Sequence, residues 1–192
     1  IIGNCQSAAL VSKTGSIDWS CLPIFDSSSV FAKILDDEIG GSFSFDVSDD
    51  YKITQEYLEN TCILITNFTS KEGVFELHDF MPRYHKTNGS YHNPPEIIRY
   101  VKLVSGKPAF RVQYNPKLEY ALDDTITHLK KDFIVSLTDK DSYDTLFMYT
   151  NLNKQDVVDR TEITLTEDAY FLVSYNEKIF KTNLNTIQTE LE

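Results

Sequence analysis

Hydrophobic and polar residues alternate with a period of two along much of this chain, which is the pattern of half-buried β-strands. Nine segments follow it clearly: 42–47, 61–68, 74–80, 97–104, 109–114, 133–138, 145–150, 162–166 and 170–175. Polar turns separate these segments at intervals of about ten residues. The even spacing favours an all-β fold, an antiparallel β-sandwich, over alternating α/β units.

A further strand pair is predicted at the N-terminus. Ala8 to Ser12 is small and apolar, and Ser16 to Cys21 returns in alternation after a Lys13-Thr14-Gly15 turn. Because side chains alternate along a strand, Trp19 is expected on one face and Asp18 on the other.

Only two short helices are expected. The first covers Ser28 to Leu35 and is capped by Asp26 or Ser27. Its four apolar residues, Val30, Phe31, Ile34 and Leu35, are expected to be buried. The second starts at Thr182 and repeats Leu184, Ile187 and Leu191 at helical spacing. Nothing after it would bury this apolar face, as is typical of the beginning of an interdomain helix. We therefore expect a sandwich domain over 1–180 and the start of a linker helix over 181–192.

Composition and charge exclude two classes of partner. The 192 residues carry a net charge of −11, which repels nucleic acid. No apolar run approaches the roughly 18 residues that a membrane helix needs. The three cysteines form no CxxC pair, so we expect neither a zinc site nor a disulfide framework, but reduced, buried thiols. Unpaired cysteines favour a cytoplasmic location. Because the chain begins with Ile1 and not with Met, the absence of a signal peptide says nothing about the location.

One long irregular segment, 81–95, interrupts the strands and is a candidate functional or disordered loop. Together with His78 it places three histidines at seven-residue spacing, with His85 and His92 in the loop. Metal ligands normally come in short-spaced pairs, so these are interpreted as surface histidines. We expect no metal and no other cofactor.

Three motifs occur in a fixed order along the first half of the chain. The first runs from Ile2-Gly3-Asn4 to Ala8-Ala9-Leu10-Val11-Ser12. The second joins Gly15-Ser16-Ile17-Asp18-Trp19 to Cys21-Leu22-Pro23 and Phe25-Asp26-Ser27, and the third is Asp79-Phe80-Met81-Pro82-Arg83. With a weaker match over 101–120, the chain resembles the bacterial and archaeal branch of glycoside hydrolase family 15, which contains glucoamylases, glucodextranases and trehalases.

The resemblance implies a supersandwich-like N-terminal β domain, followed in the family by an (α/α)6 barrel with two catalytic glutamates. That barrel is not within these 192 residues. The expected function is therefore a non-catalytic accessory domain that braces the barrel of the same parent chain and shapes its active-site mouth. The parent would hydrolyse α-glucosidic bonds of glucans or trehalose by inversion.

The candidate substrate-rim or interdomain residues are Asp18, Trp19, Pro23, Phe25, Asp26 and Arg83. A structural role stays open for Asp26 as a helix cap or turn residue, for Asp18 as the partner of a backbone amide or a lysine, and for Trp19 as a core residue. No catalytic residue is assigned in this chain. Two other functions also stay open, an autonomous glucan-binding module that stacks sugars on its aromatic rings and a structural domain that mediates homo-oligomerisation.

Overall fold

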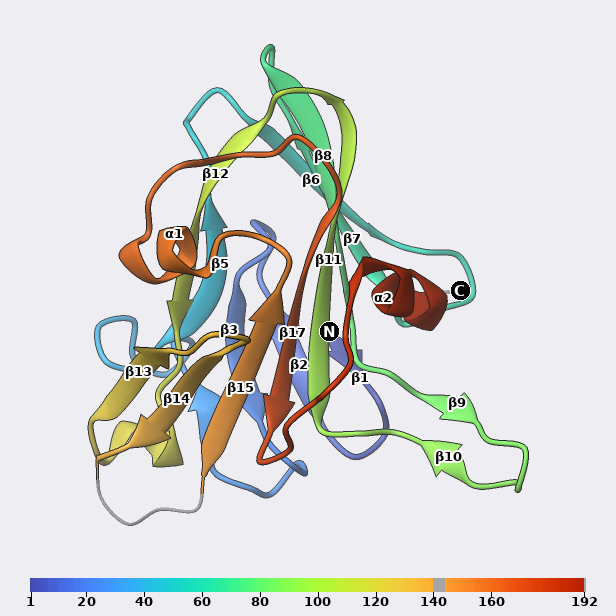
Figure 1. The fold of residues 1–192 in the computed structure, drawn as a ribbon, viewed down its shortest axis with the longest axis vertical. Helices are drawn as coiled ribbons and strands as arrows, with labels where there is room; N and C mark the ends of the chain where they lie inside the picture. The colour runs from blue at the N-terminus through green and yellow to red at the C-terminus, as the bar shows by residue number, and fades with distance from the viewer. Residues whose placement is uncertain (140–143, 192) are drawn as a thin grey trace.

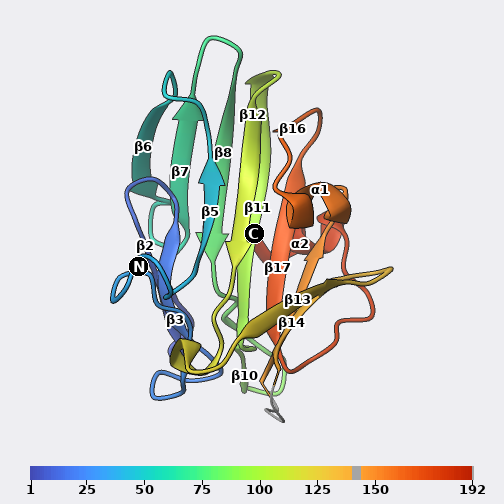
Figure 2. The same ribbon diagram turned by 90° about the vertical axis from the view of Figure 1, so that its left-hand side faces the viewer.

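The computed structural model describes residues 1–139 and 144–191 and confirms the antiparallel β-sandwich (Figures 1 and 2). The larger sheet has the order β13-β14-β15-β17-β11-β8-β7-β6, and the smaller has β1-β2-β3-β5-β12-β16 with β4 paired to β3. The strands of the larger sheet are β6 (Lys52–Tyr57), β7 (Leu64–Thr69), β8 (Gly73–Phe80), β11 (Glu96–Gly106), β13 (Thr125–Leu129), β14 (Ile134–Thr138), β15 (Thr145–Thr150) and β17 (Ala169–Tyr175). Those of the smaller sheet are β1 (Ile2–Gly3), β2 (Ala8–Val11), β3 (Ile17–Cys21), β4 (Ser29–Phe31), β5 (Ser42–Asp46), β12 (Ala109–Asn115) and β16 (Ile163–Thr164).

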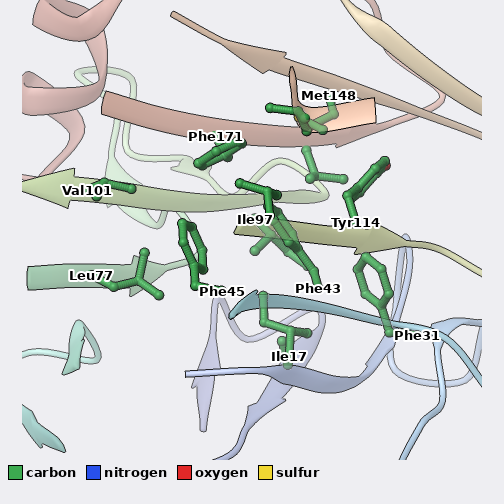
Figure 3. Packing of buried hydrophobic residues seen from close by; sticks show 14 of the residues in the cluster. Ile17, Phe31, Phe43, Phe45, Leu77, Ile97, Val101, Tyr114, Met148 and Phe171 are labelled. Carbon is green, nitrogen blue, oxygen red and sulfur yellow. The ribbon is translucent and has the colours of Figure 1, made fainter. Parts of the chain in front are cut away.

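The main core lies between the two sheets and is rich in aromatic rings (Figure 3). Phe43 of β5 meets Phe171 of β17 edge-on, with their ring centroids 5.5 Å apart. Phe68 and Phe75, on neighbouring strands of the larger sheet, are stacked at 4.4 Å. Burial of these large rings removes much apolar surface from water and holds the sheets face to face.

The predicted C-terminal helix is confirmed as α2 (Leu184–Leu191), but its apolar face is not left uncovered. Ile187 is fully buried, and Leu184 and Leu191 pack with it against a second apolar cluster on the outer face of the larger sheet. Gln188 Nε2 also donates a hydrogen bond to the Tyr100 hydroxyl over 3.1 Å. The expectation of an unburied helix face was wrong because both faces of this sheet are apolar.

The predicted helix at 28–35 does not form. Its first part is β4, in which Ser29 and Phe31 pair with β3, and its second part is a turn that leaves Ile34 and Leu35 exposed. Val30 and Phe31 are buried as expected, but as strand residues. Pairing with β3 and packing of Phe31 against Tyr114 override the local helical pattern.

Several elements have no counterpart in the prediction. They are β1, β6, β13, the helix α1 (Lys154–Asp159) capped by Asn153, a 3₁₀ turn (Glu119–Ala121), and a hairpin of β9 (Tyr84–His85) and β10 (Tyr91–His92) inside the segment expected to be irregular. Figure 1 shows this hairpin projecting from the sandwich. The sequence also predicts a polar turn at 139–142, between the strands expected at 133–138 and 145–150; apart from Asp139, this turn lies outside the described residues.

The cysteines are all free thiols, but only Cys21 is buried, where desolvation raises its pKa. Cys5 and Cys62 are exposed, so the prediction of buried thiols was wrong for both. Neither helix in the described part of the chain is long and apolar enough to cross a membrane.

Candidate functional site

The third motif contains an acid that the fold buries completely. Asp79 lies near the end of β8, opposite Arg99 on β11, and neither side chain is exposed to solvent. Arg99 Nε donates to Asp79 Oδ1 over 2.8 Å, and Arg99 Nη2 donates to Asp79 Oδ2 over 3.0 Å. The pair is therefore a bidentate, charge-assisted ion pair.

Arg99 also connects the two sheets. Its Nη1 donates to the Phe43 carbonyl oxygen of β5 over 2.5 Å, and its Nη2 donates to the Gly15 carbonyl oxygen in the turn between β2 and β3. The guanidinium carbon lies 4.6 Å from the centre of the Phe43 ring. Complete burial raises the pKa of Asp79, while the charge and hydrogen bonds of Arg99 oppose that rise. These contacts make the pair a junction between the sheets.

Our sequence reasoning missed Arg99. A signal for it was present, because Arg99 interrupts the apolar run Ile97-Ile98-Arg99-Tyr100-Val101 of a strand buried on both faces. A charged side chain in such a run is rarely buried unless it is paired. The arginine in this run therefore predicts an acidic residue on a neighbouring element.

The second motif ends in the loop between β3 and β4, residues 22–28, which we call the β3–β4 loop. Ile24 and Phe25 are 45% and 61% exposed there, and Asp26 is also exposed. The loop contains a cis peptide bond between Leu22 and Pro23. It presents apolar side chains to solvent, although such side chains usually lie in the core.

Hydrogen bonds hold the β3–β4 loop at both sides. The Phe25 amide donates to the Gln6 carbonyl oxygen over 2.9 Å, and the Tyr120 hydroxyl donates to the Ser27 carbonyl oxygen over 3.3 Å. The Ser27 amide closes a turn by donating to the Ile24 carbonyl oxygen over 3.1 Å. The exposed Phe25 therefore stands on a backbone that other segments fix in place.

Asn4, from the first motif, links this loop to the base of the β9–β10 hairpin. Its buried side chain accepts hydrogen bonds from the Gln6 and Ser7 amides over 3.1 and 3.0 Å. Its Nδ2 donates to the Pro94 carbonyl oxygen over 2.8 Å. Since Phe25 binds Gln6, a continuous set of hydrogen bonds runs from the β3–β4 loop through Asn4 to the hairpin base.

The candidate residues divide into three places. Pro23, Phe25 and Asp26 lie in the β3–β4 loop, while Asp18 and Trp19 lie on β3 and are half-buried. Asp18 accepts a hydrogen bond from Ser16 Oγ over 2.5 Å, and Trp19 pairs with Leu10 on β2. Asp26 lies in a turn and caps no helix, because the helix expected after it is a strand.

The sixth candidate, Arg83, is exposed just before the β9–β10 hairpin and covers one of its rings. Its guanidinium carbon lies 3.9 Å from the centre of the Tyr91 ring. The His85 ring lies against Tyr91 and the His92 ring against Tyr84 in tilted arrangements, at 4.0 and 4.7 Å between ring centroids. Cross-strand ring contacts of this kind stabilise a two-stranded hairpin.

The three histidines are not gathered in one place. His78 is buried on β8, where its Nε2 lies 2.8 Å from Glu76 Oε2, so its interpretation as a surface residue was wrong. Within residues 1–139 and 144–191, no group of three or more His, Cys, Asp or Glu is placed to hold a metal ion.

Comparison with known proteins identifies the family of this chain. Residues 1–142 match the family model described as trehalase-like, N-terminal. The chain is similar to a trehalase of Thermoplasma volcanium, 37% identical over 145 residues, and to trehalase 2 of Sulfolobus acidocaldarius, 38% identical over 123 residues. A trehalase of Mycolicibacterium smegmatis is 23% identical over 204 residues, covering 92% of this chain.

The first two matches cover 73% and 64% of this chain, but only 23% and 19% of the relatives. The third covers 30% of its relative. The chain thus spans about a quarter of the length of these relatives. No solved structure matches it significantly. Since the family match covers both the ion-pair junction and the β3–β4 loop, the chain belongs to the family of trehalase-like N-terminal domains.

Proposed function

We propose that this chain is the non-catalytic N-terminal domain of a family 15 trehalase, and that its β3–β4 loop packs against the catalytic barrel beside the active-site mouth. The similar proteins that are named trehalases favour trehalose over maltooligosaccharide as the parent's substrate. In this scheme both catalytic glutamates lie outside the chain. The chain itself transfers no proton to substrate.

The observation that carries the proposal is the exposure of Ile24 and Phe25 on a loop with a fixed backbone. Exposed apolar groups of this kind mark interaction surfaces when they are grouped. A loop held in place before binding also loses little conformational entropy when it docks. Asp26 and Pro23 share the loop and would lie at the edge of the contact.

Arg83 supports a second contact in the same region. It is exposed at the base of the hairpin, and the Asn4 hydrogen bonds tie that base to the β3–β4 loop. Its guanidinium, covering Tyr91, gives a flat cationic surface that suits carboxylates or sugar hydroxyls. Arg83 is therefore assigned to the rim of the same interface.

The test compares a double substitution in the β3–β4 loop with a control substitution elsewhere, each made in the enzyme that contains this domain and its barrel. Phe25→Ser with Ile24→Ser should lower kcat/KM for trehalose about tenfold, which corresponds to the loss of about 1.4 kcal/mol from a central apolar contact. Val104→Ser, as exposed as Ile24 but close to the β11–β12 turn, is the control and should leave kcat/KM unchanged. Equal effects of the two changes would refute the assignment of the loop.

A second measurement separates this function from the other candidates. The 192-residue chain alone should neither hydrolyse trehalose or maltoheptaose nor bind them in isothermal titration. Binding at millimolar or lower concentration without hydrolysis would instead favour a glucan-binding module. Turnover by the pure chain would contradict the non-catalytic assignment.

A further inference from the structure

The helix α2 covers a hollow on the outer face of the larger sheet that gathers three carboxyl groups. The hollow has a volume of about 340 Å³, and Ile98, Leu172 and Ile187 form part of its lining. Glu96 opens β11, Glu177 follows β17, and Glu190 is on α2; all three line the same hollow. Like charges in a partly apolar hollow repel one another strongly.

The hydrogen bonds around these acids leave the repulsion largely uncompensated. Glu190 Oε1 accepts a hydrogen bond from the Tyr84 hydroxyl over 3.4 Å, and its Oε2 is buried without a partner. Among the described residues, no Lys, Arg or His forms an ion pair with Glu96, Glu177 or Glu190.

Charged and titratable groups face Glu96 from every neighbouring element. They are Glu190 on α2, Glu177, Lys178 and Lys181 in the segment before α2, His92 and Tyr84 on the hairpin, and Tyr149 on β15. Tyr149 holds the segment before α2 to the sheet, because its hydroxyl accepts a hydrogen bond from the Ile179 amide over 2.9 Å. The negative charges of Glu190 and Glu177 both raise the pKa of Glu96.

We propose that α2 is a pH-sensitive latch on the larger sheet, closed while Glu96 holds a proton and loosened when all three carboxyl groups are ionised. Opening the latch brings Glu96 and Glu190 into water and separates their charges. It also uncovers the apolar surface around Ile98 and Leu172. The device is independent of the β3–β4 loop and of the activity proposed for the parent.

The direction of the pH effect follows from the raised pKa. Burial, followed by the charges of Glu190 and Glu177, raises the pKa of Glu96 to about 7 in the closed state. In the open state it returns toward the ordinary value of 4.5. Between these values opening releases a proton, so rising pH favours opening; below about 4.5 and above about 7 the effect levels off.

Native-state hydrogen exchange of the 192-residue chain tests the latch. Rates of the α2 amides, corrected for the intrinsic pH dependence of exchange, should show an opening constant on the order of 50-fold larger at pH 8 than at pH 5. Amides in the centre of β11 should not follow this trend. Equal protection of α2 at both pH values would overturn the proposal.

Substitutions show which carboxyl group causes the pH dependence of α2 opening. Glu96→Gln should make α2 protection nearly independent of pH and, at pH 8, greater than in the unmodified chain. Glu190→Gln should keep the transition but move its midpoint to lower pH. Glu72→Gln, in an exposed turn between β7 and β8, is the matched control and should behave as the unmodified chain. Full pH dependence in the Glu96→Gln chain would overturn the proposal.

A titration of the unmodified chain gives a test that needs no variant. The carboxyl carbon of Glu96, followed by NMR, should titrate with a midpoint near 7, as the raised pKa requires. A midpoint near the ordinary value of 4.5 would overturn the latch, even if the Glu96→Gln chain failed to fold.

Discussion

The ion-pair junction and the β3–β4 loop both contain residues of the family motifs, yet the fold uses them in opposite ways. Asp79 and Arg99 are completely buried and bind each other through two hydrogen bonds, while two more from Arg99 join the larger sheet to the smaller one. Phe25, in contrast, is 61% exposed and contributes little to the core, although hydrogen bonds fix its backbone. A motif residue that the fold buries is explained by the fold, while an exposed one on a fixed backbone is available for contact with a partner.

Differences in burial also explain why the acidic residues of the motifs have different roles. Asp79 has a cation and no access to solvent, whereas Asp26 is exposed in a turn. Asp18 lies between these extremes, half-buried and bound to Ser16. The loss of stability in single variants at these positions should therefore increase with the burial of the substituted side chain, whichever motif contains it.

The largest effect is expected at the junction. Arg99→Met leaves the Asp79 carboxyl buried without a cation, so the free energy of unfolding should fall by about 3–5 kcal/mol in urea titrations. The double change Asp79→Leu with Arg99→Met removes the unpaired charge and should recover part of that loss. A double variant less stable than Arg99→Met alone would contradict this account of the junction.

A smaller effect is expected at Asn4, which links the β3–β4 loop to the base of the β9–β10 hairpin. Asn4→Ala removes three hydrogen bonds of a buried side chain, which should lower the free energy of unfolding by about 1–3 kcal/mol. Hydrogen exchange of the Phe25 amide should also become faster, because its partner Gln6 is no longer held by Asn4. Asn185→Ala, at an exposed position of α2, is the control and should change stability by less than about 0.5 kcal/mol.

Asp18 should give an intermediate result. Asp18→Ala removes the hydrogen bond from Ser16 Oγ at a half-buried position, with an expected loss of about 0.5–1.5 kcal/mol in the free energy of unfolding. Thermal unfolding of Asp18→Ala, Ser16→Ala and the double variant would measure their coupling. Strictly additive losses would show that this hydrogen bond contributes no stability.

The smallest effect on stability is expected in the β3–β4 loop. Phe25→Ser should change the free energy of unfolding of the 192-residue chain by no more than about 0.5 kcal/mol, since the ring is mostly exposed. Chemical denaturation measures this directly. A loss above about 1 kcal/mol would mean that Phe25 supports the fold, and the contrast with the junction would disappear.

Much of the architecture could be predicted from the alternating pattern. Strands such as β5 and β12 were predicted to within about two residues, because period-two alternation is strong where a strand buries only one of its faces. The segment 28–35 failed because helical spacing of four apolar residues was only a local signal. The edge strand β6 was missed because its exposed residues are mainly polar.

The candidate site could be predicted only in part. The β3–β4 loop was found through the motif that ends in Phe25-Asp26-Ser27, and the structure shows that loop exposed. Arg99 was missed because its partner is 20 residues away on a neighbouring strand. Glu96 and Glu190 were missed because 94 residues separate them in the sequence, and only the packing of α2 brings them to one hollow.

The sequence by itself determined the all-β class, the family resemblance and the loop that leads from β3, because these depend on residue types at short spacing. The tertiary structure alone decided that Asp79 pairs with Arg99, that α2 lies on the sheet, and that Glu96 shares its environment with Glu190. The physical reason is that burial and charge interactions act through space. Strand order and sheet packing, and not distance along the chain, set which groups meet.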